Sequence, residues 1–263
     1  MIDVEADGPV GRLTINRPER SNALDAEAIA ELEAGYRTLD ENPGVRVVVL
    51  RGAGRGFCSG HDLAPKNGAA PLEVMEDWDL LLQQNRMLLR LWDGDTPVIA
   101  ALHGYCMGHA VEIVNVCDLS VATHTCRFAH PAIRGAGGSP NALTYPFALG
   151  LSRAKEYLWV TPDLDGRTAT EWGLVNRSVP EDELDEAVET WARRIASMPA
   201  ENIRTMRRGM RRIAEQAGFR LAIEMGADLD ALAHTGRATA TWRQTVAEVG
   251  LAQAIKRRDE AFQ

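Results

Sequence analysis

The chain has 263 residues, of which 45% are hydrophobic and 25% charged, and its formal net charge is −8. A chain of this length can bury a sizeable core, as one large domain or as a core domain with a smaller helical piece. The acidic balance argues against general binding to nucleic acids or anionic membranes, because such binders usually carry an excess of basic residues.

The sequence shows no targeting or membrane signal. No stretch approaches the ~20 apolar residues of a membrane-spanning helix, and the acidic N-terminus lacks the pattern of a secretory signal. The four cysteines, Cys58, Cys106, Cys117 and Cys126, show no paired metal-ligand spacing. We expect them to be buried thiols of a cytoplasmic protein that binds no metal. Cys58 as a catalytic nucleophile is the alternative, although no neighbouring residue resembles an activating base.

Strand and helix signals alternate from the N-terminus. Residues 1–6 and 10–15 are predicted to pair as a hairpin across an Asp-Gly-Pro turn. Asp25 is a candidate N-cap for a helix that ends near Leu39. The β-branched run at residues 45–50 is typical of a buried strand in a parallel sheet.

A glycine-rich loop follows at residues 51–63, and its four glycines indicate special backbone angles. The loop lacks the lysine and adjoining hydroxyl residue of a phosphate-binding P-loop, which excludes that interpretation. Residues 72–92 are then predicted to form a long helix that buries its leucines.

The most informative stretch is residues 96–121. An apolar run at 97–102 predicts a buried strand, and the turn after it leads through Gly108 into a helix that starts at His109. Unpaired N–H groups at a helix start favour a developing negative charge, and glycine allows a ligand to approach closely. Glu112 lies one turn inside this helix between apolar residues. This position favours a catalytic role over a carboxylate that only caps a neighbouring N–H.

The last third of the chain is predicted to be helical. A short strand at 117–122 and a glycine- and proline-rich loop at 127–141 precede helices at 151–160, 165–172 and 181–196. The order predicts a mixed α/β core over residues 1–198 and a helical C-terminal region over 199–263. Five arginines between positions 204 and 212 form a basic helix. Its basic side is interpreted as a solvated face, or as a surface near an anionic ligand or an acidic neighbour.

Several short motifs follow one another along almost the whole chain. They are INRP at 15–18 with NAL at 22–24, residues 47–63, residues 97–118, AKE at 154–156, WGLVN at 172–176, and Lys256-Arg257 followed by Phe262. Each motif is weak alone, but the ordered set resembles the enoyl-CoA hydratase/isomerase family, the crotonase superfamily.

The resemblance implies an α/β fold of repeated ββα units in a spiral. Its C-terminal helices would mediate oligomerisation, so a homotrimer or a dimer of trimers is expected. The substrate implied is an acyl-CoA thioester, with no cofactor beyond the coenzyme A of the substrate and no nucleic-acid or membrane partner. The family also implies an oxyanion hole for the thioester carbonyl, formed here by the backbone N–H groups of His61 and His109.

By the same resemblance, coenzyme A is expected to lie along two loops and the C-terminal helix. The residues expected to contact it are Arg20, Ala23, Leu24, Ser59, Asp62, Leu63 and Lys256 or its neighbour Arg257, with the basic side chains meeting phosphates. A solvated chain end is the alternative role of Lys256 and Arg257. Residues 72–92 are expected to line the acyl end of the site.

Two positions depart from the family's pattern. Hydratases of the family place a second glutamate in a Pro-Glu pair, where this chain has Pro131-Ala132, and a methyl group cannot transfer a proton. His109 stands where glycine is usual, and its imidazole is either an added functional group or a core side chain. His130 lies beside the missing glutamate and is a candidate acid or base, with a packing role as the alternative.

The leading hypothesis is therefore reversible hydration of a 2-enoyl-CoA, with Glu112 as the one carboxylate and His130 or a second water filling the gap. Double-bond isomerisation is the runner-up, because one group can remove and return a proton. Decarboxylation or C–C hydrolysis of an acyl-CoA is a third possibility, since it depends mainly on the oxyanion hole. A different class is a non-catalytic paralogue that binds acyl-CoA, against which the retained Glu112 argues.

Overall fold

A computed structural model describes residues 1–63, 72–135, 142–161, 163–260 and 262. Its centre is a six-stranded sheet in the order β1-β2-β3-β4-β6-β8. The strands are β1 (Ile2–Asp7), β2 (Val10–Ile15), β3 (Val47–Gly52), β4 (Val98–Leu102), β6 (Leu119–Thr123) and β8 (Arg177–Val179). The β1–β2 hairpin is antiparallel, as the sequence predicts, and every other pair is parallel.

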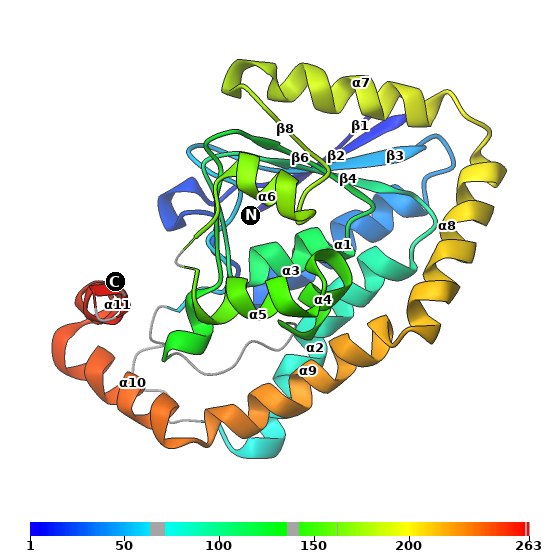
Figure 1. Ribbon diagram of the computed structural model, residues 1–263. Helices are drawn as coiled ribbons and strands as arrows, with labels where there is room; N and C mark the ends of the chain where they lie inside the picture. Colours follow the sequence, from blue (N-terminus) through cyan, green and yellow to red (C-terminus); the bar gives the residue numbers. More distant parts are fainter. Residues whose placement is uncertain (64–71, 136–141, 162, 261, 263) are drawn as a thin grey trace.

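Alternating residues of the parallel strands bury opposite faces of the sheet. In β3, Val47 and Val49 pack in the cluster that includes α7 (Leu184–Ala196). Val48 and Leu50 pack instead with α1 (Ala26–Asp40), α2 (Val74–Asp93) and α3 (His109–Val116). The α7 helix accordingly lies on one side of the sheet and α1 and α3 on the other (Figure 1). Both faces are covered, which explains why the strand reads as a continuous apolar run.

A second, smaller layer follows the ends of the large strands. Strands β5 (Tyr105–Met107) and β7 (Arg127–Ala129) pair in parallel, and Cys58 forms a parallel bridge to Cys106 of β5. Each turn of the chain thus starts with a strand of the large sheet and continues with a short strand or bridge segment. In the turns that start with β3 and β4, a helix follows. This order confirms the expected spiral of ββα units. The sequence interpretation of β5 and β7 as turn and loop was wrong, because three residues are too few to show the strand period.

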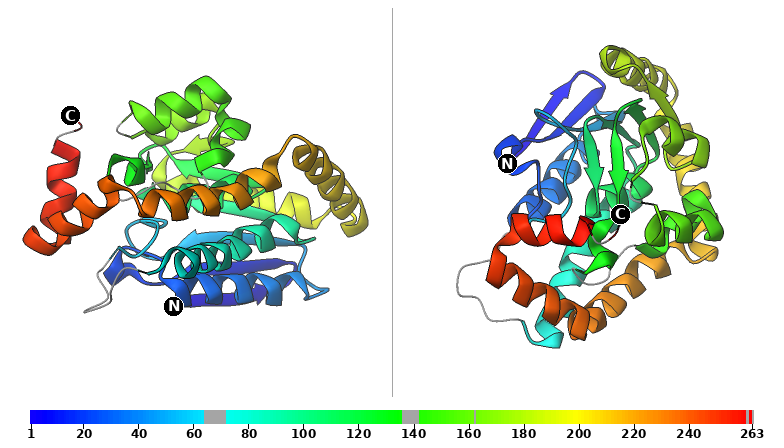
Figure 2. Two further views of the ribbon diagram at one scale, coloured as in Figure 1. Left: turned by 90° about the horizontal axis from the view of Figure 1, so that it is seen from below. Right: turned by 60° about the vertical axis from the view of Figure 1, so that its left-hand side comes forward.

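The remaining helices complete the molecule. They are α4 (Tyr145–Leu149), α5 (Leu151–Trp159), α6 (Gly166–Trp172), α8 (Ala200–Gln216), α9 (Phe219–His234), α10 (Arg237–Val249) and α11 (Leu251–Glu260). The last four form an arc from one end of the molecule to the other, and α9 runs along α2 (Figures 1 and 2). Within the described ranges, no helix is both long and apolar enough to span a bilayer. The boundary at residue 199 and the role of these helices in oligomerisation stay predictions.

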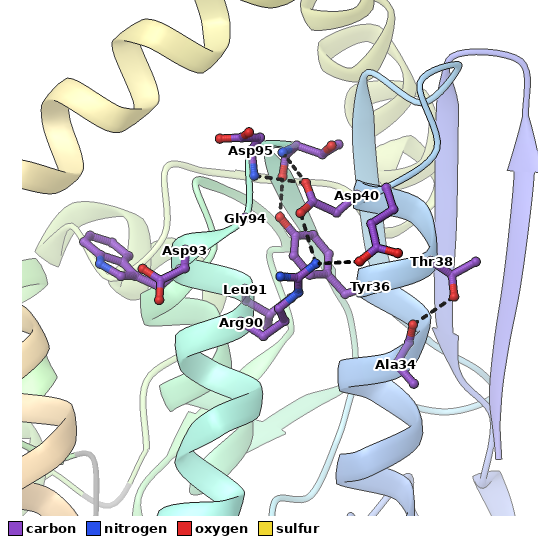
Figure 3. Close-up of polar contacts among 12 residues, drawn as sticks. Ala34, Tyr36, Thr38, Asp40, Arg90, Leu91, Asp93, Gly94 and Asp95 are labelled. Atoms are coloured by element: carbon purple, nitrogen blue, oxygen red, sulfur yellow. Dashed lines mark hydrogen bonds and ion pairs between the residues drawn. The ribbon is translucent and has the colours of Figure 1, made fainter.

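Polar contacts fix the end of α1 against the start of β4 (Figure 3). One oxygen of Asp40 accepts hydrogen bonds from the N–H groups of Asp95 at 2.9 Å and Thr96 at 2.8 Å, and the other lies 3.4 Å from Arg90. The hydroxyl of Tyr36 donates to the carbonyl of Thr96 at 2.7 Å. This buried network orients β4, which leads directly into the segment that carries the candidate site.

The basic side of α8 faces acidic neighbours. Arg204 and Arg208 lie 3.3 Å and 2.7 Å from Asp95, and Arg207 lies 2.7 Å from Asp118. For these three arginines, the interpretation as a surface near acidic neighbours is confirmed over that of a purely solvated face.

Candidate active site

A cavity of about 250 Å³ lies between α2, α9, the start of α3 and the glycine-rich loop after β3. Four of the chain's six histidines line it, His61, His109, His130 and His234, together with Glu112, Asp77 and Asp230. The structure therefore brings the four predicted catalytic residues to one place. It also adds two carboxylates that the sequence interpretation did not assign to the site.

Two backbone segments that run side by side deliver His61 and His109. The N–H of Met107 donates to the carbonyl of Cys58 at 3.0 Å, which pairs the segments just ahead of these histidines. On the other side, the carbonyl of Gly60 accepts from Leu24 at 2.8 Å, and Asp62 donates to Leu24 at 2.9 Å. Because the carbonyl of Gly60 and the N–H of His61 belong to one trans peptide group and point in opposite directions, the N–H of His61 points away from Leu24.

The N–H groups of His61 and His109 are both free donors. His109 is the first residue of α3, where an N–H has no partner within the helix. Across the described part of the chain, neither of the two N–H groups donates a hydrogen bond to a protein atom. A methyl group added at Gly60 would lie 3.2 Å from the nitrogen of His109, so the two backbones approach closely.

Two glycines make this approach possible. Gly60 has φ +90°, and a side chain there would come within 2.6 Å of the carbonyl oxygen of Met107. Gly108 precedes α3 with φ +55°, a backbone angle that side chains disfavour. Both positions need glycine, Gly60 for conformation and space and Gly108 for conformation.

Glu112 lies buried between two histidines. Its Oε2 is 2.7 Å from Nδ1 of His109, and its Oε1 is 3.2 Å from Nε2 of His130. Burial opposes ionisation of Glu112, but the hydrogen bonds from His109 and His130 outweigh it and hold the pKa well below its usual range. Because a carboxylate only accepts hydrogen bonds, these distances assign the protons to Nδ1 of His109 and Nε2 of His130.

His130 reaches this position through the β5–β7 pair. Met107 lies opposite Ala129 in that pair, and the N–H of Gly108 donates to the carbonyl of Ala129 at 2.8 Å. The residue after Ala129 is thereby held against the first turn of α3, where Glu112 lies.

The imidazole of His61 stacks on that of His109, with ring centroids 4.1 Å apart and an angle of 20° between the planes. Burial, and secondarily the neighbouring His109, lower the pKa of His61 to about 3. His61 is therefore neutral at pH 7. The Nε2 atoms of both rings are buried and meet no hydrogen-bond partner in the described residues.

A second polar cluster faces the same cavity from α2 and α9. Nδ1 of His234 is 2.6 Å from Asp77, and its Nε2 is 3.4 Å from Oδ2 of Asp230. Burial raises the pKa of Asp230 to about 6, although His234 opposes the shift. The prediction that residues 72–92 line the site is supported by Asp77, Leu80, Leu81 and Gln84 of α2.

The sequence carried a weak signal for this second cluster. Residues 77, 80, 81 and 84 have the spacing of one helix face, and residues 230 and 234 lie one turn apart in a largely apolar helix. Only the packing of α9 along α2 shows that these faces meet.

Of the residues expected to contact coenzyme A, some line the cavity and others lie beside it. Ser59 and Leu63 line the cavity, and Ala23 and Leu24 are buried beside the loop. Arg20 makes two 3.0 Å contacts to Asp62.

In the C-terminal helix, the expected contact of Lys256 with coenzyme A stays a prediction. Lys256 is an exposed side chain 3.7 Å from Glu260, and Arg258 of the same helix lines the cavity instead.

Two other sequence interpretations concern Cys58, which precedes the cavity-lining residue Ser59, and Ala132. Burial raises the pKa of Cys58 to about 12, which disfavours the thiolate that a nucleophile requires. Ala132 lies in the wall near Glu112, so the departure from the family's second glutamate falls inside the site. Among the described residues, no group of three or more His, Cys, Asp or Glu side chains is arranged to hold a metal ion.

Comparison with known proteins gives consistent matches. The model of the enoyl-CoA hydratase/isomerase family matches residues 5–245. The chain is 34% identical over 209 residues to a probable enoyl-CoA hydratase, echA12, of Mycobacterium bovis, covering 76% of this chain and 72% of that protein. It is 31% identical over 202 residues to (E)-benzylidenesuccinyl-CoA hydratase of Thauera aromatica, covering 74% and 76%. The crystal structure of an enoyl-CoA hydratase/isomerase from Xanthobacter autotrophicus Py2 superposes with a TM-score of 0.94 at 32% identity, over 100% and 98% of the two chains.

Proposed function

Because this chain belongs to the enoyl-CoA hydratase/isomerase family, we propose that it catalyses the reversible addition of water to a 2-enoyl-CoA. The observation that carries the proposal is that the N–H groups of His61 and His109, which lie at one cavity beside Glu112, donate no hydrogen bond within the described residues. Hydration at such a substrate places negative charge on the thioester oxygen.

In this proposal the two N–H groups bind that oxygen as an oxyanion hole. They are held in place before the reaction by the paired segments and by Gly60, so no reorganisation is needed when charge develops. Removal of one such donor typically raises the barrier by about 3–4 kcal/mol.

Of the two histidines on either side of Glu112, His109 supplies the proton transfers. With its proton on Nδ1, His109 presents an unprotonated Nε2 that can accept a proton from water as the oxygen adds to C3 of the substrate. The electron pair of the double bond moves toward the thioester and gives the enolate. Return of that proton from the same imidazole to C2 yields the 3-hydroxyacyl-CoA, while His130 keeps its hydrogen bond to Glu112.

Glu112 acts as a positioning residue in this scheme. Both of its oxygens accept hydrogen bonds from histidine rings, so it fixes their orientation and stabilises the ring that becomes protonated, as the carboxylate of a catalytic triad does. The second glutamate of the family's hydratases is replaced by Ala132, and His109 takes over its proton transfer.

Double-bond isomerisation is the second candidate, and the alanine at position 132 favours it because a single base can carry a proton between two carbons. Incubation of the purified protein with crotonyl-CoA tests hydration as a loss of the enoyl-thioester absorbance. Incubation with a 3-enoyl-CoA tests isomerisation as a gain of that absorbance. Tight acyl-CoA binding without turnover in either assay, across a range of chain lengths, would contradict the enzyme proposal and favour a binding paralogue.

A further inference from the structure

The cavity wall formed by α2 and α9 contains two buried hydrogen-bond acceptors, on Asp230 and Gln84. Asp230 is 4% exposed, and its Oδ2 lies 3.4 Å from His234. Its other oxygen, Oδ1, is buried and meets no donor among the described residues. The side-chain oxygen of Gln84, on the same wall, is likewise buried without a donor.

An acceptor buried without a donor is unfavourable, and most strongly so on a charged group. The cost is recovered when a bound molecule supplies the missing donor. A fully apolar acyl chain would press against Asp230 and leave the cost in place. The two oxygens therefore indicate a donor on the part of the substrate that lies against α2 and α9.

We infer that the substrate is a 2-enoyl-CoA whose acyl chain carries a hydroxyl group, which donates a hydrogen bond to Asp230 with Gln84 as a second acceptor. This inference rests on the proposed function, because it concerns the acyl part of the same cavity. It names a substrate class that the oxyanion hole alone does not select.

The charges around this wall favour a neutral donor. Asp77 and Asp230 would repel an acyl chain that ends in a carboxylate. His234 lies between the two carboxylates, and Arg258, which lines the same cavity, is paired with Asp259 at 2.8 Å. An ammonium group would bring a positive charge into the cavity together with its N–H donors. A hydroxyl group supplies a hydrogen-bond donor without adding a charge.

The test compares 2-enoyl-CoA thioesters of equal chain length that end in a methyl, hydroxyl, ammonium or carboxylate group. We expect the wild-type protein to turn over the hydroxyl-ended substrate with a kcat/KM about 10–100-fold above that of the methyl-ended one, the range of a hydrogen bond to a charged group. Equal values, or a preference for the methyl, ammonium or carboxylate end, would overturn the inference and leave the proposed hydratase function standing.

Matched variants on α9 assign the effect to one side chain. Asp230→Leu should bring the ratio of hydroxyl-ended to methyl-ended kcat/KM close to one, whereas Asp228→Leu, at an exposed position two residues away, should keep the wild-type ratio. Loss of the ratio in both variants would contradict a specific role of Asp230. If Asp230→Leu does not fold, Gln84→Leu takes its place and should lower the ratio of hydroxyl-ended to methyl-ended kcat/KM below that of the wild-type protein. An unchanged ratio in Gln84→Leu would then contradict the inference.

The two proposals can fail separately. If no 2-enoyl-CoA is turned over, the hydratase proposal fails, and calorimetric binding of saturated acyl-CoAs with and without the hydroxyl then tests the cavity by itself. Tighter binding of the hydroxyl-ended thioester would support the inference, and equal binding would overturn it.

Discussion

The substitution Glu112→Gln separates the charge of this side chain from its shape. The carboxylate accepts hydrogen bonds from two histidines, at 2.7 Å and 3.2 Å. Glutamine has a single acceptor oxygen, so at least one contact is lost or reversed, and the negative charge that stabilises a protonated imidazole disappears. A hydrogen bond to a charged group contributes about 1.5–3 kcal/mol.

We expect Glu112→Gln to lower kcat by about 10²–10⁴-fold, which corresponds to roughly 3–5 kcal/mol of activation free energy. The initial rate of crotonyl-CoA hydration, followed by the loss of enoyl absorbance, measures this change. The Kd of a saturated acyl-CoA should stay nearly unchanged, because the variant alters neither the N–H groups nor the loops expected to hold coenzyme A.

Asp40→Asn is the control, because Asp40 is a partly buried carboxylate that also accepts several hydrogen bonds but lies outside the cavity. It should lower the free energy of unfolding while kcat per folded molecule stays at the wild-type value. If kcat of Glu112→Gln remains within about threefold of wild type, the reasoning is refuted and Glu112 is a structural residue.

Three further outcomes follow from the same geometry. Gly60→Ala should lower turnover by about 10²–10³-fold, the cost of one oxyanion donor. The added methyl group would lie 2.6 Å from the oxygen of Met107 and 3.2 Å from the nitrogen of His109. Full activity with an unshifted Tm would contradict this expectation. Asp230→Asn should raise the free energy of unfolding by up to ~3 kcal/mol at pH 8 and by much less near pH 4. Burial raises the pKa of Asp230 to about 6, above the ~3.9 of an unfolded aspartate. Ionisation of Asp230 therefore destabilises the native state as the pH rises, and asparagine removes this effect. Urea unfolding at the two pH values checks the sign, and an equal effect at both would contradict it. Ala132→Glu should raise hydration of crotonyl-CoA, by up to about 10²-fold, and a fall in activity with loss of binding would show that this part of the cavity is reserved for the substrate.

Local signals in the sequence were sufficient for the features that depend on neighbours in the chain. Asp25 is a helix N-cap and accepts a hydrogen bond from the N–H of Ala28 at 2.9 Å. The start of α3 at His109 is likewise as predicted. Each of these depends on a few consecutive residues, such as a capping side chain or a glycine turn.

Contacts between distant segments were beyond the same reasoning. His130 was identified as a candidate beside the missing glutamate, but its contact with Glu112 depends on the three-residue pair β5–β7. Asp77 and Asp230 stand 153 positions apart, and no local pattern indicates that α2 and α9 pack together. Helix packing of this kind is set by whole faces, so a single sequence does not specify which faces meet.

The vibrational spectrum of a bound thioester shows whether the N–H groups of His61 and His109 bind the thioester oxygen. An acyl-CoA labelled with ¹³C at the carbonyl would be measured free, bound to the wild-type protein and bound to Gly60→Ala. We expect a C=O stretch at clearly lower frequency on the wild-type protein than in water and a smaller shift on Gly60→Ala, because two donors polarise the bond. A carbonyl frequency equal to that in water, with the thioester demonstrably bound, would contradict the claim.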